Sequence, residues 1–420
     1  MKIKYKVKPY DEVAKIVKEK HKKPLKPNIF WRTLIQVLSF FALLPIKFKY
    51  KKTGMDKLGA KEPCLILMNH SCFNDFEIAS TLLYPRPFNI VTTSDGFVGK
   101  NWLMRQIGCI STQKFVTDVT LVRDILYTIR KLKSSVLMYP EASYSFDGTA
   151  TTLPESLGGL LKMLKVPVVM IETFGAFSRN PLYNNLQIRK VPIEAEIRYI
   201  LSPEDIATKA IDELNEVLRQ QFSFDGFRWQ QENKVRIKEN FRADQLNRVL
   251  YKCPNCNTEG KTEGKETLLT CRECGKKYEL DEYGKMVALN GDTEFSHIPD
   301  WYRWERECVR AELLDNKYLL SVDVDIYMLV DTKCLYKVGN GHLTHNRNGF
   351  TLVGCDGALN YTQKPKASYS LYSDYNWYEL GDMICIGNND VLYYCFPKTT
   401  DDVVAKTRLA TEELYKIANE

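Results

Sequence analysis

A histidine and an aspartate five positions apart, His70 and Asp75, have the types and the spacing for acid–base chemistry. His70 follows a four-residue apolar run, Leu65 to Met68, with the length of a buried strand. Asp75 opens a stretch, Phe76 to Tyr84, with apolar residues at helical spacing. If His70 lies in the turn and Asp75 in the first helical turn, the aspartate can orient the imidazole and stabilise its protonated form. Alone, so short a pattern is more often accidental or structural.

Two further strand-like runs favour a functional role for the His70–Asp75 pair. Val136 to Tyr139 ends at Pro140-Glu141, and Val166 to Ile171 forms a third run. In an open α/β sheet, ligands bind beyond the carboxyl ends of the strands, which is where both His70 and Glu141 fall. We therefore expect an α/β domain, a central sheet flanked by helices, with its site at this edge.

Four segments resemble, in order, the motifs of the glycerolipid acyltransferases, the group that includes lysophosphatidic acid acyltransferase. They are Asn69-His70 through Asp75, Gly108-Cys109-Ile110 with Lys114, Tyr139-Pro140-Glu141, and Val166-Pro167-Val168. The resemblance covers roughly residues 29–214. It implies a 1-acylglycerol-3-phosphate acyltransferase-like O-acyltransferase (EC 2.3.1) of phospholipid biosynthesis. A fatty acyl group would pass from coenzyme A or acyl carrier protein to a hydroxyl of a lysophospholipid-like acceptor, with His70 as general base.

The motifs depart from the family pattern where the acceptor is expected to bind. Lys114 replaces the usual arginine of the second motif. The third motif reads Pro-Glu-Ala-Ser-Tyr in place of Pro-Glu-Gly-Thr-Arg, so Tyr144 replaces the arginine of that motif. The resemblance implies that Glu141, Lys114, Tyr144 and Asn69 contact the acceptor. Without an arginine fork, we expect an acceptor with less charge than free lysophosphatidic acid. The alternative is that Arg105, Lys114 or Arg123 supplies the charge from another direction.

The first sixty residues carry a strong positive charge. They hold sixteen Lys or Arg against four Asp or Glu, a net charge of +12 within a chain total of +7. Such a segment favours an anionic surface, either nucleic acid or the cytoplasmic face of a membrane. The thirteen-residue apolar stretch from Leu34 to Ile46 lies between basic residues and is short of the ~20 residues that span a bilayer. We expect an interfacial helix on anionic lipids, peripheral or monotopic, and no nucleic acid; the alternative is a buried core helix.

Four cysteines downstream have the spacing of a metal site. Two Cys-x-x-Cys pairs are separated by fourteen residues: Cys253 with Cys256, and Cys271 with Cys274. Four thiolates at this spacing predict a tetrahedral Zn²⁺ site of zinc-ribbon type, and four protein ligands leave no open position, so the metal is structural. The preceding stretch, Arg228 to Lys252, is predicted to be a solvated connecting helix.

The last part of the sequence predicts a mostly β domain ending in a helix. An amphipathic helix is expected over Trp301 to Leu314, hairpin turns at Gly339 to Gly341 and Asn348-Gly349, and a closing helix capped by Thr400. The strand-like runs are Tyr318 to Val330, Cys334 to Val338, His342 to His345, Phe350 to Val353, Ser368 to Tyr372, Met383 to Ile386 and Val391 to Phe396. The pattern resembles the pleckstrin-homology-like fold. Thirteen basic and twenty acidic residues after residue 290 argue against phosphoinositide binding and favour an autonomous domain or one that binds a protein partner.

These observations divide the chain into four parts. We predict a basic membrane-interfacial segment over residues 1–60, an acyltransferase domain with a closing helix over 61–250, a zinc ribbon over 251–291 and a β-rich domain over 292–420. A different class of function stays open: a degenerate lipid-binding scaffold that recruits partners through the ribbon and the C-terminal domain. A hydrolase acting on the same acyl thioester is a third alternative.

Overall fold

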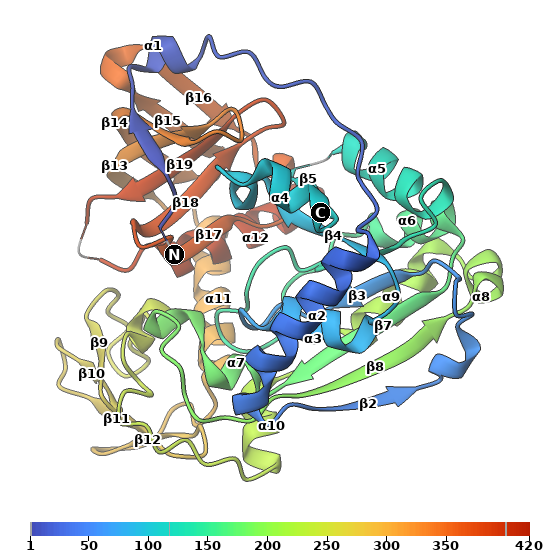
Figure 1. The fold of residues 1–420 in the computed structure, drawn as a ribbon. Helices are drawn as coiled ribbons and strands as arrows, with labels where there is room; N and C mark the ends of the chain where they lie inside the picture. Colours follow the sequence, from blue (N-terminus) through green and yellow to red (C-terminus); the bar gives the residue numbers. More distant parts are fainter. Residues whose placement is uncertain (1, 117, 400) are drawn as a thin grey trace. The chain divides into compact units, whose positions relative to one another are not determined.

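The computed structural model describes residues 2–116, 118–399 and 401–420. Two compact units make up the chain (Figure 1). The α/β unit comprises Lys20–Arg179 and Ile188–Trp229. The C-terminal unit comprises Met1–Glu19, Asn180–Gln187 and Gln230–Glu420. The beginning of the chain therefore belongs to the same unit as its end.

A seven-stranded mixed sheet, in the order β2-β8-β7-β3-β6-β4-β5, forms the centre of the α/β unit. Neighbouring strands are parallel except at the pair β7 and β8, which is antiparallel. The strands are β2 (Lys49–Thr53), β3 (Leu65–Met68), β4 (Phe88–Thr93), β5 (Cys109–Thr112), β6 (Ser135–Met138), β7 (Val168–Phe174) and β8 (Glu194–Leu201). Since β3 lies between β6 and β7 in parallel, the turns that follow these strands meet at one edge of the sheet.

Two apolar cores cover the two faces of this sheet. Alternate residues of β3 point to opposite faces, so Ile66 joins the core that contains α3 while Leu67 joins the core that contains α5, α6 and α9. The helices are α2 (Ile29–Leu43), α3 (Asp75–Leu83), α4 (Asn101–Gln106), α5 (Val119–Arg130), α6 (Leu157–Leu164), α7 (Ala176–Arg179), α8 (Pro203–Thr208), α9 (Ile211–Gln221) and α10 (Gly226–Glu232). The expected sheet flanked by helices is confirmed.

Two antiparallel sheets build the C-terminal unit. A four-stranded sheet in the order β12-β11-β10-β9 holds Cys271 at the end of β10, and seven consecutive strands form the path β16-β15-β14-β13-β19-β18-β17. The N-terminal β1 (Tyr5–Val7) pairs in parallel with β14, and α1 (Tyr10–Val13) follows it. The other elements are β9 (Thr262–Lys265), β10 (Leu268–Cys271), β11 (Lys277–Leu280), β12 (Met286–Ala288), α11 (Ile298–Leu314), β13 (Leu320–Leu329), β14 (Leu335–Asn346), β15 (Gly349–Gly354), β16 (Leu359–Gln363), β17 (Tyr372–Trp377), β18 (Gly381–Gly387), β19 (Leu392–Pro397) and α12 (Val404–Asn419).

The mostly β region with a final helix is thus confirmed, but several details differ from the sequence prediction. Gly339 to Gly341 is not a hairpin turn: it lies inside the long strand β14, where the register with β13 shifts. A Cβ on Gly341 would lie 2.5 Å from the carbonyl oxygen of Val353, so glycine serves strand packing there. Thr400, the expected helix cap, lies outside the described residues.

The predicted connecting helix over Arg228 to Lys252 is also largely absent. Helix α10 ends at Glu232, and turns and a short 3₁₀ helix follow. Ile237, Leu246 and Leu250 are buried, which explains why this polar-looking segment folds onto the C-terminal unit instead of forming a solvated helix.

Candidate active site

His70 and Asp75 form a direct pair at the carboxyl edge of β3. The Nδ1 atom of His70 lies 2.9 Å from Oδ2 of Asp75. Strand β3 ends at Met68 and α3 begins at Asp75, so the histidine occupies the turn and the aspartate the first helical position, as the sequence predicts. The His70 side chain is 18% exposed, whereas Asp75 is buried. With Nδ1 facing Asp75, the free nitrogen of the imidazole is Nε2.

Backbone amides hold the Asp75 carboxylate in place. Its Oδ2 atom also accepts hydrogen bonds from the backbone N–H groups of Ser71, at 3.0 Å, and of Cys72, at 3.3 Å. A carboxylate that accepts several such bonds keeps a fixed position relative to the turn. Asp75 therefore orients the imidazole from a rigid support.

Burial and two charges act on the imidazole. Burial lowers the pKa of His70 below its usual value, Asp75 raises it through its hydrogen bond and charge, and the positive charge of Lys114 lowers it further. The net direction is downward, so His70 is neutral at neutral pH, which is the form that accepts a proton. Burial also raises the pKa of the Cys72 thiol well above its usual value, so this cysteine stays protonated and is no nucleophile.

Glu141 ties the turn of His70 to the loop that follows β6. Its Oε1 accepts a hydrogen bond from the His70 backbone N–H, at 3.2 Å, and its Oε2 accepts one from the Thr151 backbone N–H, at 2.8 Å. The carboxylate is fully buried. The structure therefore brings Glu141 to the site, where both oxygens contact the protein backbone.

Asn69 is likewise engaged within the protein. Its Oδ1 accepts from the backbone N–H of Thr173 at 2.8 Å, and its Nδ2 donates to Ser71 Oγ at 3.0 Å and to the carbonyl of Thr173 at 3.3 Å. The side chain is fully buried. It fastens the end of β3 to β7 and thereby supports the turn that carries His70.

Aromatic rings surround His70. The centroids of Tyr139 and Tyr144 lie 4.2 Å and 4.0 Å from the imidazole centroid, with interplanar angles of 26° and 25°. Phe73 stands edge-on to Tyr144 with the centroids 5.8 Å apart. The sequence placed Tyr144 at the site as an acceptor contact, but nothing in its spacing indicated that it stacks on the base.

The remaining candidate cations are differently placed. Lys114 lies within electrostatic reach of His70. The guanidinium of Arg105 donates to the carbonyls of Lys22 and Lys23, so it anchors the N-terminal segment. Arg179 follows β7 in α7, and its guanidinium donates to the carbonyls of Arg189 and Val191, each at 3.1 Å.

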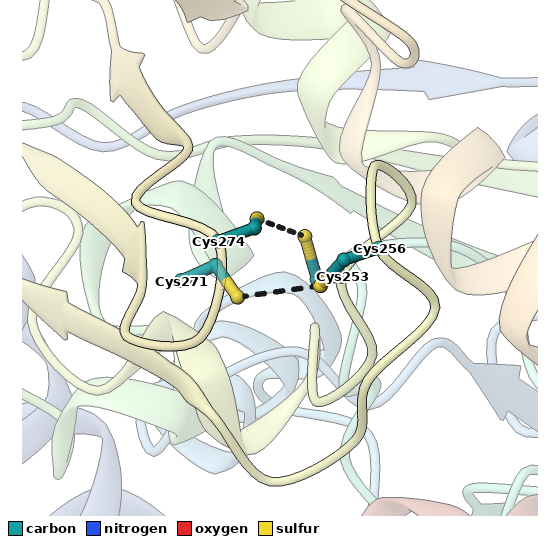
Figure 2. Close-up of side chains that lie close together, drawn as sticks. All are labelled: Cys253, Cys256, Cys271 and Cys274. Atoms are coloured by element: carbon teal, nitrogen blue, oxygen red, sulfur yellow. Dashed lines mark hydrogen bonds between the residues drawn. The ribbon is translucent and has the colours of Figure 1, made fainter.

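The four cysteines converge in the C-terminal unit (Figure 2). The sulfur atoms of Cys253 and Cys274, and those of Cys256 and Cys271, lie 3.7 Å apart. A tetrahedral site with Zn–S bonds of ~2.3 Å has sulfur atoms about 3.8 Å apart, whereas a disulfide needs about 2.05 Å. The cluster is therefore arranged to hold a metal ion, and the donor set suits zinc.

Helix α2 presents an apolar face to the outside. Its exposed apolar side chains are Ile29, Phe30, Leu34, Val37, Leu38, Phe40 and Phe41. The helical stretch Ile29–Ile46 has 18 residues and is apolar and long enough to cross a membrane by length and composition only. The helix is longer than the predicted thirteen-residue stretch because it begins at Ile29, where Asn28 caps it.

Comparisons with known proteins give a family match for part of the α/β unit. Residues 49–172 match the family model described as Acyltransferase. A search of curated proteins finds no match. Among solved structures, the chain is similar to the 1-acyl-sn-glycerophosphate (LPA) acyltransferase PlsC from Thermotoga maritima, at 14% identity over 46% of this chain and 81% of that chain, with a TM-score of 0.34.

The family match spans every residue of the candidate active site and less than half of the chain. It supports an acyltransferase domain in the α/β unit. The cysteine cluster and the large β-sheet of the C-terminal unit, β13 to β19, lie outside the match, so the zinc ribbon and the pleckstrin-homology-like fold stay predictions.

Proposed function

We propose that this protein is an O-acyltransferase that moves a fatty acyl group from a thioester donor, coenzyme A or acyl carrier protein, to a hydroxyl of a lysophospholipid-like acceptor. The observation that carries the proposal is the contact of 2.9 Å between His70 and Asp75 at the carboxyl edge of the sheet. The family match over residues 49–172 supports the reaction class.

The chemistry follows from the two side chains. Nε2 of His70 accepts the proton of the acceptor hydroxyl while the hydroxyl oxygen attacks the thioester carbonyl carbon. The C–S bond breaks as the new C–O ester bond is completed, and the imidazolium returns the proton to the leaving thiolate. Asp75 stabilises the transient imidazolium and keeps Nε2 directed at the acceptor.

An assay with defined substrates tests this proposal. Purified protein is given an acyl-coenzyme A or an acyl carrier protein thioester together with a series of lysolipids, and both free thiol and lipid ester are measured. We expect thiol and ester in equal amounts. Thiol without ester would support the hydrolase alternative. Lipid binding without either product would support the scaffold alternative and contradict the proposal.

We propose a lysolipid acceptor with less charge than lysophosphatidic acid. A phosphate monoester is best held by an arginine fork, whereas this chain has a tyrosine at position 144 and Lys114 supplies only a point charge. A lysophospholipid with a substituted head group should react faster than lysophosphatidic acid. Tyr144→Arg should shift the ratio of the two rates toward lysophosphatidic acid. A wild-type preference for lysophosphatidic acid that is unchanged in this variant would contradict the assignment.

We also propose that α2 lies in the interface of an anionic membrane, at the cytoplasmic face. Its exposed apolar face continues into exposed lysines, Lys47, Lys49, Lys51 and Lys52. The 18 residues of Ile29–Ile46 extend about 27 Å at 1.5 Å per residue, slightly less than the ~30 Å hydrocarbon core. Apolar residues would enter the acyl region while lysines contact the head groups, each contributing ~1 kcal/mol.

Point substitutions test the membrane proposal better than truncation, because Leu43 and Ile46 belong to the core of the α/β unit. The double variant Phe40→Ser, Phe41→Ser should bind anionic vesicles at least tenfold more weakly, since burying one phenylalanine contributes ~1.5–3 kcal/mol. The matched control is Leu314→Ser, Leu319→Ser, two exposed residues of the C-terminal unit. Equal vesicle binding by both variants would contradict the proposal. So would vesicle binding by the wild type that does not weaken as the salt concentration rises.

A further inference from the structure

The imidazole of His70 lies between two tyrosine rings. Each ring is nearly parallel to the imidazole, with centroids within 4.2 Å. Two tyrosine rings could not both stack this closely on the same face of the imidazole, because they would overlap each other. Tyr139 and Tyr144 therefore cover opposite faces. Asp75 takes the Nδ1 edge. The edge with Nε2 is what remains for a substrate.

Both tyrosines are held by the segment that follows β6. Tyr139 comes directly after this strand, and Ala142 adopts a left-handed conformation, with φ of 54°, that turns the chain back toward the site. Glu141 fixes this turn to the backbone of His70. The position of Tyr144 over the imidazole is thus set by the fold of the turn.

The next residues lock the loop from its other side. The Ser145 hydroxyl donates to the carbonyl of Thr149 at 2.6 Å and accepts from the backbone N–H of Gly148 at 2.9 Å. The Asp147 carboxylate accepts from the backbone N–H of Thr149 at 3.1 Å. A loop with this many internal hydrogen bonds holds Tyr144 without help from a substrate.

We propose that Tyr139 and Tyr144 clamp the His70 imidazole, and that Tyr144 is a positioning residue that keeps Nε2 aimed at the acceptor hydroxyl. The inference rests on the proposed function of His70 as general base. Two rings against its faces stop the imidazole from turning about its Cβ–Cγ bond. They also offer their π-faces to the imidazolium that forms when the proton is taken, in a place where its faces meet no water.

Kinetics of three variants test the clamp. Tyr144→Phe keeps the stacking face and should keep kcat within threefold of wild type. Tyr144→Leu removes the face and should lower kcat on the order of ten- to hundredfold with little change in the KM for the acceptor, because misplaced groups lose rate and not ground-state binding. Tyr361→Leu, which removes a half-buried tyrosine of the C-terminal unit, is the matched control and should change neither.

The opposite results overturn the proposal. If Tyr144→Leu keeps kcat within threefold, the clamp does not position the base. If it raises KM at constant kcat, Tyr144 contacts the acceptor instead. If Tyr144→Phe loses as much as Tyr144→Leu, the hydroxyl and not the stacked face matters.

A measurement without turnover separates this inference from the proposed function. The chain has five histidines, so proton NMR resolves their ring signals, and a His70→Ala spectrum assigns those of His70. Ring currents from both faces should shift the His70 signals upfield. Tyr144→Leu should move them downfield and Tyr144→Phe should not. Unchanged signals in Tyr144→Leu would overturn the clamp even if acyl transfer is found, and a shift would support the stacked geometry even if acyl transfer fails.

Discussion

At the scale of single residues, the imidazole of His70 is tuned by opposing influences. Burial lowers its pKa and Asp75 raises it, while the charge of Lys114 lowers it again. The result is a base that stays neutral over a wider pH range than a free histidine. Its weaker basicity is offset by a fixed orientation, because Asp75 and the two tyrosines leave only one edge free.

This balance predicts the pH dependence of the reaction. Because the base must be neutral, kcat/KM should rise with pH and level off with a midpoint below the ordinary histidine pKa of ~6.5. Asp75→Asn removes the influence that raises the pKa, so the midpoint should move to lower pH while the plateau falls by roughly 10²- to 10⁴-fold. A pH-rate profile of both proteins checks this. A midpoint that moves upward in Asp75→Asn would show that the pair is misassigned.

The pairing of His70 with Asp75 was predictable because strand, turn and helix each have a local signal. The roles of the surrounding residues were not. Asn69 and Glu141 look like substrate contacts in a linear motif, and only the fold reveals that they also accept hydrogen bonds from the backbone N–H groups of Thr173 and Thr151. Whether an aromatic side chain stacks or faces solvent depends on loop geometry that spacing does not specify.

At the scale of elements, α11 and α12 are joined by a buried ionic cluster. Arg306 contacts Glu412 at 2.7 Å and Glu413 at 3.0 Å, and Arg408 contacts Glu412 at 3.2 Å. Burial raises the pKa of Glu412, but the charges of the two arginines and the hydroxyl of Ser370 outweigh this and lower it to about 2. The carboxylate is therefore charged and paired throughout the ordinary pH range.

The cluster predicts an acid sensitivity. The folded-state pKa of Glu412 is below its unfolded value of ~4.3, so its stabilisation is complete above that pH and is lost as the pH falls toward 2. Glu412→Gln leaves the buried Arg408 and the half-buried Arg306 less well paired and should destabilise the C-terminal unit by about 3–5 kcal/mol at neutral pH. Denaturant unfolding at several pH values measures both effects. A loss below 1 kcal/mol would mean that the cluster is solvated.

The cysteine cluster gives a second prediction at this scale. We expect one zinc per chain, because four thiolates complete a tetrahedral shell. Cys256→Ser should lower zinc affinity sharply, whereas Cys308→Ser, a cysteine of α11 outside the cluster, should not. Metal analysis of the purified protein checks both. Protein without zinc would contradict the assignment.

Strands and helices with strong periodicity were predictable, and exceptions have physical reasons. The run from Cys334 to His345 reads as two strands because Gly339 and Gly341 resemble turn residues, but β14 is continuous since glycine lets two neighbouring strands approach closely there. The stretch after Glu232 reads as a solvated helix because its residues are polar and helix-favouring, but scattered apolar residues such as Ile237 are buried.

At the scale of the whole molecule, the sheet next to the cysteine cluster and the β-rich region belong to one compact unit. The indole N–H of Trp301 donates to the carbonyl of Lys252 at 3.0 Å, and the backbone N–H of Lys252 donates to Glu305 at 2.8 Å. Ring packing between Tyr278 and Trp301, with centroids 4.9 Å apart, adds to this. The segments around the cysteine cluster are thereby packed on α11.

This arrangement predicts how metal loss spreads. Chelation of zinc should increase hydrogen exchange in the four-stranded sheet and in α11. The free energy of metal binding stabilises the folded state of the residues around the site, so this stabilisation is lost with the metal. The α/β unit forms its own core, so its exchange and the acyl-transfer rate should change less than twofold. If chelation abolishes acyl transfer while the α/β unit stays folded, the metal takes part in the reaction.

The central claim is that His70 is the general base, and one comparison tests it most directly. His342 is also paired with an aspartate, with Nδ1 2.8 Å from Oδ1 of Asp323, but on an exposed part of the C-terminal unit. We expect His70→Ala to lower ester formation from an acyl thioester by roughly 10²- to 10⁴-fold with an unchanged unfolding transition, and His342→Ala to stay within twofold of wild type. Ester formation by folded His70→Ala within fivefold of wild type would contradict the account.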